Sequence, residues 1–282
     1  MSSSPQFPTM LGSAIRRAQH QLLDRPLVLD DPVVLDLVPE ARDPNILAAA
    51  TGSDLVDALL RAMFVMRSRF AEDRLARAVE RGARQYVIIG AGLDSFPWRQ
   101  PTFARDLKIF AVDHPASLAL TRDLLREKGF AMPANLTHVP ADLRHQAIKE
   151  QLAAGGFDDS RTTFCSLLGV TQYIDRRTID ELLRFALGLK AGSELVLSIV
   201  PPDDEINGID LVVAARSAGR AASVGEPWTC RMRPNETLRQ LTNLGFSNVF
   251  HLTPDLAQAR YFSGRKDSLR APKWEHLLTA TV

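Results

Sequence analysis

Two glycines and two aspartates in the middle of the chain have the spacing of a nucleotide-binding site. Gly90 and Gly92 end a short apolar, β-branched run, and Asp113 ends the next such run about 20 residues later. Asp142 follows a third run. A tight glycine turn lets a cofactor approach the backbone, and an ionised acid after the second strand accepts hydrogen bonds from ribose hydroxyls. The pattern predicts a nucleoside-containing cofactor at the carboxyl edge of a parallel sheet.

Each of these residues also has a purely structural interpretation. The third glycine of a dinucleotide loop would fall at Ser95, so Gly90–Asp94 can equally be a turn that only ends a strand. Asp113, together with His114 and Pro115, can cap the helix that follows. The local pattern leaves both alternatives open.

The elements that must position these residues follow a βαβ pattern. Short apolar runs alternate with amphipathic segments, which predicts an α/β fold with a mostly parallel sheet. The predicted strands are 86–89, 107–112, 136–139, 162–168 and 194–200, then an antiparallel pair at 246–252 and 260–262. Helices are predicted at 116–128, 174–189 (starting near Asp175), 206–222 and 235–244.

The first part of the chain, residues 10–83, lacks a convincing strand pattern and is predicted to be helical. A helix is expected over 11–23, then short helices and turns between prolines, then a helix with Ser53 as N-cap and a second run, Phe70–Glu80. Arg67 and Arg69 are two residues apart and therefore point to different faces of their helix. One can turn inward toward the glycine turn, although two surface arginines are the alternative.

The composition is that of an ordinary soluble globular protein, with 45% hydrophobic and 24% charged residues and a formal net charge of +1. This charge gives no electrostatic case for nucleic acid or an anionic membrane as partner. Two distant cysteines, Cys165 and Cys230, predict neither disulfides nor a metal site. Without an apolar run of membrane-spanning length or a secretion signal, we expect a cytoplasmic protein.

Five segments carry a family resemblance, with their order and spacing preserved over most of residues 45–272. They resemble the leucine carboxyl methyltransferase family, and within it the bacterial branch that includes polyketide and other natural-product O-methyltransferases: Gln85–Arg99, Val112–Ala116, Ala141–Arg144, Ser166–Tyr173 and Tyr261–Pro272. The resemblance implies a Rossmann-like class I methyltransferase that uses S-adenosylmethionine (SAM) and releases S-adenosylhomocysteine. It implies a seven-stranded sheet with helices on both faces and a helical lid. We therefore expect a helical clamp or lid at 1–83 and a SAM-binding catalytic domain at 84–282, with a lid insertion at about 203–235.

The resemblance also implies site residues. Arg67 matches the arginine that holds the methionine carboxylate of SAM, a role that suits the bidentate guanidinium fork. The Gly90–Gly92 turn lies under the methionyl part, and Asp113 matches the ribose-binding acid. Asp142 and Leu143 match the pair that holds adenine.

The chain departs from the family pattern at Ala111 and Leu168, where the family has glutamates. The loss of the carboxylate at Leu168 makes a protein C-terminus a poor expectation for the acceptor and favours a small molecule. A carboxyl acceptor is slightly preferred over a hydroxyl, because a carboxylate is already ionised and needs no general base.

The acceptor-side residues are expected from their position alone. Tyr173 in the strand-four motif can contact either SAM or the acceptor, with a packed aromatic as the alternative, and Trp228 can bound the acceptor or anchor the insertion. His114 and His145 are expected in cap or surface roles. No catalytic residue is assigned. Two other functions stay open: an NAD-dependent oxidoreductase, which lacks an evident hydride-transfer constellation here, and a SAM-binding protein that does not methylate.

Overall fold

A seven-stranded sheet forms the centre of the protein, and the computed structural model describes it within residues 8–51, 55–267 and 269–282. Its strand order is β3-β2-β1-β4-β5-β7-β6, with β1 to β5 parallel and β7 antiparallel to both neighbours. The strands are β1 Gln85–Ile89, β2 Lys108–Asp113, β3 Leu136–Pro140, β4 Thr163–Leu167, β5 Glu194–Ile199, β6 Ser247–Leu252 and β7 His276–Thr281. This seven-stranded, mostly parallel sheet is the α/β architecture that the sequence predicts.

The register of the parallel strands brings the predicted site residues to one edge. Ile89 of β1 pairs with Val112 of β2 and with Leu167 of β4, and Asp113 pairs with Pro140 of β3. The residues that follow β1, β2, β3 and β4 therefore meet at the carboxyl ends of the strands, where open parallel sheets bind ligands.

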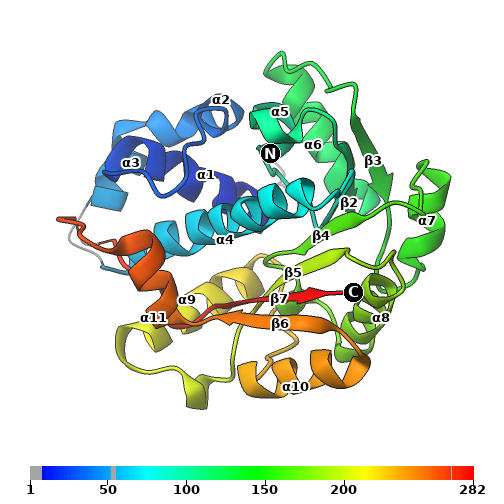
Figure 1. Ribbon diagram of the computed structural model, residues 1–282. Coiled ribbons are helices and arrows are strands. Elements are labelled where there is room, and N and C mark those ends of the chain that lie inside the picture. The colour runs from blue at the N-terminus through cyan, green and yellow to red at the C-terminus, as the bar shows by residue number, and fades with distance from the viewer. Residues whose placement is uncertain (1–7, 52–54, 268) are drawn as a thin grey trace.

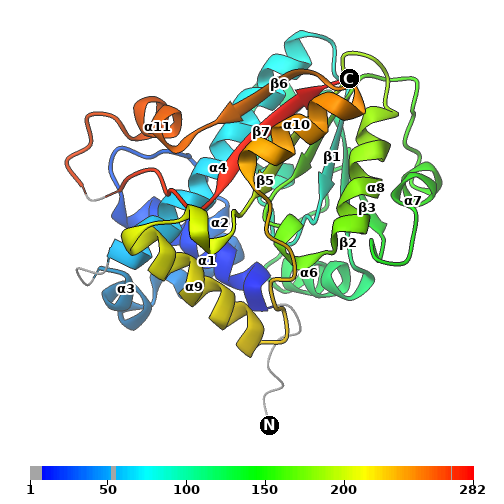
Figure 2. The same ribbon diagram turned by 90° about the horizontal axis from the view of Figure 1, so that it is seen from below.

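Helices cover both faces of this sheet, and Figure 2 shows α4 on one side and α8 and α10 on the other. Alternate residues of each buried strand supply the two apolar layers: Tyr86 and Ile88 of β1 pack toward α4, and Val87 and Ile89 pack toward α7 and α8. The helices include α1 Pro8–Leu23, α4 Leu55–Glu80, α6 Pro115–Glu127, α7 Ile148–Ala154, α8 Arg176–Leu187, α9 Gly208–Ser223 and α10 Pro234–Leu244.

The helices before the sheet gather at its carboxyl edge. Figure 1 shows α1, α2 (Val34–Leu37) and α3 (Pro44–Thr51) together on one side of α4, and α9 on the other side of α4. The two helical runs predicted around Arg67 are one continuous helix, α4, since nothing between them interrupts the helical pattern. Ser53, the predicted N-cap, lies outside the described residues.

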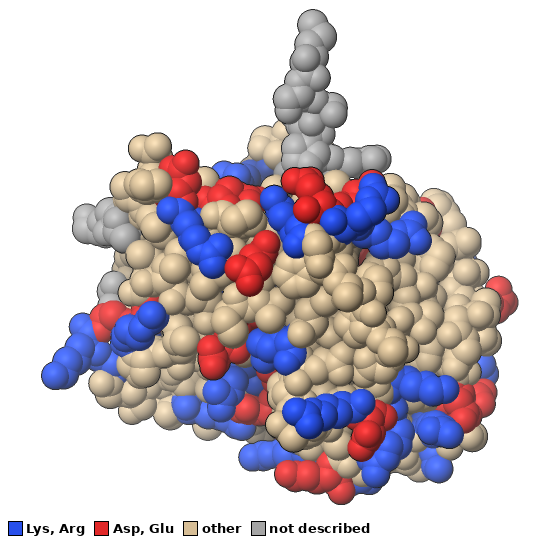
Figure 3. Space-filling view, turned by 90° about the horizontal axis from the view of Figure 1, so that it is seen from above, with Lys and Arg blue, Asp and Glu red and all other residues tan. Residues whose placement is uncertain are grey.

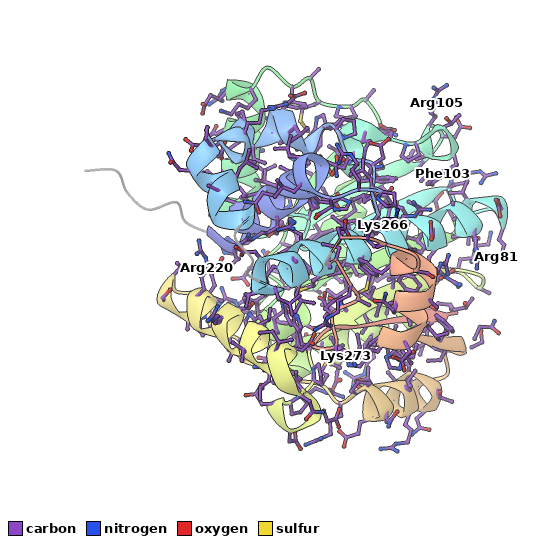
Figure 4. The ribbon with its side chains drawn as sticks, turned by 90° about the vertical axis from the view of Figure 1, so that its left-hand side faces the viewer. Arg81, Phe103, Arg105, Arg220, Lys266 and Lys273 are labelled. Atoms are coloured by element: carbon purple, nitrogen blue, oxygen red, sulfur yellow. The ribbon has the colours of Figure 1, made fainter. Side chains whose placement is uncertain are left out.

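The closing strand was predicted in the wrong place. Residues 260–262 are not a strand: Gln258–Phe262 form a π-helical turn that continues α11 (Pro254–Ala257) and buries Phe262. The strand is β7, formed by the tail, which returns along the sheet between β5 and β6. Residues 269–275 lead to it and pack against α4 through Leu269 and Ala271, and Figure 4 labels Lys273 in this segment. A run of three residues offers too little apolar surface to compete with His276–Thr281, which is mostly buried.

The surface carries mixed charge, in keeping with the net charge of +1. Figure 3 shows a face on which Lys and Arg side chains lie beside Asp and Glu side chains, around a broad uncharged area. Among the described residues, no helix combines the length and apolar character needed to cross a membrane.

Candidate cofactor and acceptor site

The glycine turn after β1 is closely packed. Gly90 and Gly92 have positive φ angles of 76° and 49°, which are backbone conformations that favour glycine. A Cβ on Gly90 would overlap the side chain of Val170, in the turn after β4. The turns after β1 and β4 therefore approach each other closely, and glycine is required for that approach.

Asp113 is tied directly to this turn. Its Oδ2 accepts a hydrogen bond from Gly92 N at 2.6 Å, and its Oδ1 accepts one from His114 N at 2.7 Å. Burial raises the pKa of Asp113, and the two backbone hydrogen bonds oppose that rise. The Ser117 hydroxyl also contributes a hydrogen bond to this carboxyl group, and because a carboxylate has about four acceptor positions, Asp113 keeps capacity for a ribose hydroxyl.

The helix-capping role considered for Asp113 is filled by His114, the next residue. His114 is the N-cap of α6, and its Nδ1 accepts a hydrogen bond from Ala116 N at 3.2 Å. The cap role expected for His114 is therefore confirmed, and Asp113 is free of it. His145 lines the surface groove between α7 and α8 described below.

Asp142 follows β3 and lies near the end of β2, since its Oδ2 is 3.8 Å from Nε2 of His114. Its pKa is lowered first by the hydrogen bond from the Arg144 side chain, whose Nε is 3.2 Å from Oδ1. Leu143 is half-buried, and it lines a groove of about 570 Å³ between the β3–α7 loop, α7 and α8. Its side chain thus belongs to the groove wall, which leaves its backbone for the predicted adenine contact.

Arg67 and Arg69 point to different faces of α4, as their spacing predicts, and Arg67 is the one that points inward. Arg67 Nη1 donates to Oε1 of Glu275 at 3.0 Å, and its guanidinium stacks over Phe64 at 4.6 Å from the ring centroid. Arg69 is 45% exposed and pairs with Asp73. The surface interpretation is therefore wrong for Arg67, and its ion pair with Glu275 is a contact that the sequence did not predict.

The predicted acceptor residues lie over the end of β4. The backbone nitrogen of Thr229 donates to the carbonyl oxygen of Gln172 at 2.7 Å, which fixes the segment carrying Trp228 beside Tyr173. Burial raises the pKa of Tyr173. Trp228 stacks on Trp274 with ring centroids 6.2 Å apart. The indole nitrogens of both tryptophans are buried; that of Trp228 lies close to the Tyr173 hydroxyl, and that of Trp274 has no hydrogen-bond partner among the described residues.

The first turn of α1 closes over the same region. Thr9 N donates to Oε2 of Glu226 in the turn before Trp228, at 3.2 Å. Met10 covers Gly92 so closely that a Cβ there would lie 3.0 Å from Met10 Cγ. The N-terminal helix therefore bridges the glycine turn and the segment between α9 and α10.

A buried charge network, also unpredicted, holds the loop that follows the glycine turn. Arg99 pairs with Glu72 of α4 through both terminal nitrogens, and its Nε is 3.4 Å from Oδ1 of the fully buried Asp31. Ser95 donates to the other oxygen of Asp31. Arg17 of α1 donates to the carbonyl oxygen of Leu93. The sequence shows only that these residues are acidic, basic or polar. Because charged helix faces are usually solvated, it does not predict that these side chains pair in the interior.

Several groups together fit a cofactor with a nucleoside and an amino-acid end. The edge combines a glycine turn without side chains, a buried acid with spare acceptor positions, a second acid after β3 and an inward arginine. No cluster of three or more His, Cys, Asp or Glu side chains suited to a metal occurs among residues 8–51, 55–267 and 269–282.

Comparison with known proteins agrees with this arrangement. The family model described as leucine carboxyl methyltransferase matches residues 10–187. The chain belongs to the leucine carboxyl methyltransferase family. A Bacillus subtilis relative, provisionally named S-adenosyl-L-methionine-dependent methyltransferase YktD, is 31% identical over 301 residues, covering 96% of each chain. A Mycobacterium marinum relative with the same provisional activity name is 32% identical over 217 residues, covering 72% of this chain and 68% of its own.

Several solved structures share the fold of this chain. A DUF574 family protein from Streptomyces avermitilis aligns with a TM-score of 0.57 at 17% identity, covering 95% of this chain and 96% of its own. A provisionally named methyltransferase from Thermobifida fusca aligns with a TM-score of 0.55 at 18% identity, covering 97% of each chain. At these identities the likeness concerns the class I methyltransferase fold alone.

Proposed function

We propose that the protein is a SAM-dependent O-methyltransferase that methylates a small molecule, with a carboxyl group as the preferred acceptor. Family membership supports the methyltransferase activity and the use of SAM. The observation that carries the site assignment is the bond from Gly92 N to Asp113 Oδ2, which joins the glycine turn and the ribose-binding candidate into one cradle.

The residues divide the work along the carboxyl edge of the sheet. Arg67 holds the methionine carboxylate, the Gly90–Gly92 turn supports the methionyl chain, and Asp113 binds the ribose. Asp142 and the backbone of Leu143 hold adenine. When bound, SAM supplies an electrophilic methyl group, and the protein aligns the acceptor with it and excludes water, a contribution of on the order of 7–11 kcal/mol in favourable cases.

Two observations favour a carboxyl acceptor over a hydroxyl. Of the two histidines nearest the acids, His114 caps α6, and His145 lines the groove between α7 and α8, away from Tyr173 and Trp228. Neither is placed to act as the general base that a hydroxyl acceptor would need. The buried indole N–H of Trp274, which has no partner among the described residues, suits an oxygen-rich acceptor, because it donates and cannot accept. A place in natural-product biosynthesis rests on the family resemblance and completes the proposal.

Calorimetry with SAM, S-adenosylhomocysteine and NAD tests the cofactor. We expect the first two to bind, and binding of NAD without SAM would refute the proposal. Asp113→Ala should weaken SAM binding about 30- to 100-fold, since a buried charged acceptor of a ribose hydroxyl is lost. Asp158→Ala is the matched control, because this exposed aspartate precedes β4 at the opposite edge. Unchanged affinity in Asp113→Ala would refute the ribose assignment.

Incubation with methyl-labelled SAM then tests the transfer. Panels of small carboxylic acids and of phenols, matched in size, separate the two acceptor classes. Labelled esters support the proposal, labelled ethers from phenols alone contradict the carboxyl preference, and SAM binding without any labelled product from a broad acceptor panel favours a protein that binds SAM without methylating.

A further inference from the structure

Arg67 and Glu275 form an ion pair between α4 and the coil entering β7. Their side chains are 12% and 1% exposed, so the pair is almost completely removed from solvent. Among the described residues, the bond from Nη1 to Glu275 is the only hydrogen bond that the structure gives Arg67. Since a guanidinium has five N–H donors in a fixed fork, most of the donors of Arg67 remain available.

Glu275 also keeps acceptor capacity. Its buried Oε2 has no hydrogen bond of normal geometry from any described residue, although the hydroxyl of Ser198, which accepts from Gly169 N at 2.7 Å, lies close to this carboxyl group. Burial raises the pKa of Glu275, and the charge of Arg67 and the Ser198 hydroxyl oppose the rise. Because each carboxylate oxygen has two acceptor positions, Oε2 can accept a hydrogen bond from a ligand even with Ser198 beside it.

The pair lies directly beside the turns that define the cofactor site. The guanidinium of Arg67 lies on Gly169, where a Cβ would overlap Nη1. Gly169 begins the turn that also contains Val170, whose side chain packs on Gly90. The ion pair and the glycine turn are thus separated only by the residues after β4.

We propose that Arg67 and Glu275 together recognise the α-amino-acid group of the cofactor. Arg67 binds its carboxylate, and Oε2 of Glu275 accepts a hydrogen bond from its α-ammonium. In this arrangement each buried charge has a partner: Arg67 faces the carboxylate of the cofactor, and Glu275 faces its ammonium group. An arginine alone would bind only the carboxylate. The inference rests on the proposed function and adds a specificity-determining residue to it.

The test compares S-adenosylhomocysteine with two analogues, one without the α-amino group and one without the carboxyl group, by calorimetry. The wild-type protein should bind S-adenosylhomocysteine at least about tenfold more tightly than the desamino analogue, because a charge-assisted hydrogen bond is lost. Glu275→Gln, which keeps the shape and an oxygen for Arg67, should remove most of this preference. Arg67→Gln should instead remove the preference over the analogue without the carboxyl group.

Glu194→Gln provides the matched control. Glu194 is an equally buried glutamate at the other end of β5, where it pairs with Arg74 and Arg81 (Figure 4 labels Arg81). Its substitution should leave the preference for S-adenosylhomocysteine over the desamino analogue unchanged. This control separates a general effect of removing a buried charge from recognition of the ammonium.

The outcomes are distinct. If Glu275→Gln weakens S-adenosylhomocysteine and the desamino analogue by the same factor, Glu275 only positions Arg67 and the inference is wrong. If that variant does not fold, the wild-type protein decides, since equal affinity for the two ligands also overturns the inference. Failure of the wild-type protein to bind either SAM or S-adenosylhomocysteine would overturn the proposed function itself.

Discussion

The two ends of the candidate cofactor site are built in opposite ways. The loop after β1, at the methionyl end, is held by buried charges from other elements: Arg99 meets Glu72 of α4 and Asp31, which is fully buried. The loop after β3, at the adenine end, holds itself through Asp142 and Arg144, two residues apart, and Arg144 is 58% exposed. One loop is fixed by the tertiary structure and the other by its own sequence.

The difference follows the demands of the reaction. A methyl transfer needs the donor group aligned with its acceptor, and displacements of about 1 Å can cost two orders of magnitude in rate. Buried charge pairs are costly to break, so they hold the methionyl end in place. The adenine end only has to bind, and exposed ion pairs worth about 1 kcal/mol or less leave that loop adaptable.

The largest expected effect comes from breaking the fixed end. Arg99→Ala should lower the free energy of unfolding by about 3–5 kcal/mol, because Asp31 and Glu72 lose their buried cation. Urea denaturation measures this change. Arg126→Ala, which removes an 81% exposed partner of Asp123, is the control and should change little. A loss below about 1 kcal/mol for Arg99→Ala would mean that the two ends do not differ in rigidity.

An effect of intermediate size is expected in the pH dependence of the free energy of unfolding, which also distinguishes the loop after β1 from the loop after β3. Burial raises the pKa of Glu72 to about 7 from its ordinary value of 4.5, despite the opposing pair with Arg99. The folded state therefore binds this proton more tightly than the unfolded state does. Its stabilising contribution is full below pH 4.5 and is lost as the pH rises toward 7.

Wild-type protein should thus lose about 1–3 kcal/mol relative to Glu72→Gln over that window, as measured by denaturation at several pH values. Asp142 gives the opposite sign, because Arg144 lowers its pKa. Relative to Asp142→Asn, the wild-type protein should lose stability as the pH falls. Parallel slopes for the two comparisons would contradict the contrast between the ends.

The smallest effect is expected at the adaptable end. Arg144→Ala should change the free energy of unfolding by at most about 0.5 kcal/mol, since the pair that it removes is exposed. Its effect on S-adenosylhomocysteine affinity, measured by calorimetry, should stay within about threefold. A loss of several kcal/mol would show that this loop is as firmly held as the loop after β1.

Much of the fold was predictable because its signals are local. The strands β1 to β6 are short apolar or β-branched runs, and Gly90, Gly92 and Asp113 stand at the strand ends where a parallel sheet gathers ligand contacts. The position of β7 was missed because a short run such as 260–262 and the run at 276–281 can each be taken for a strand when only neighbours along the chain are considered. Pairing with both β5 and β6 decides between them.

The sequence by itself determined the sheet, the glycine turn and the order in which acids follow the strands, since each depends on neighbours along the chain. Only the tertiary structure decided that Arg67 faces inward and meets Glu275, 208 residues away. It also decided that Arg99 is held by Asp31 and Glu72. A charged residue on a helix or in a coil has the same local pattern whether it is solvated or paired. Its role is set by the desolvation and Coulomb energy that distant partners impose on it.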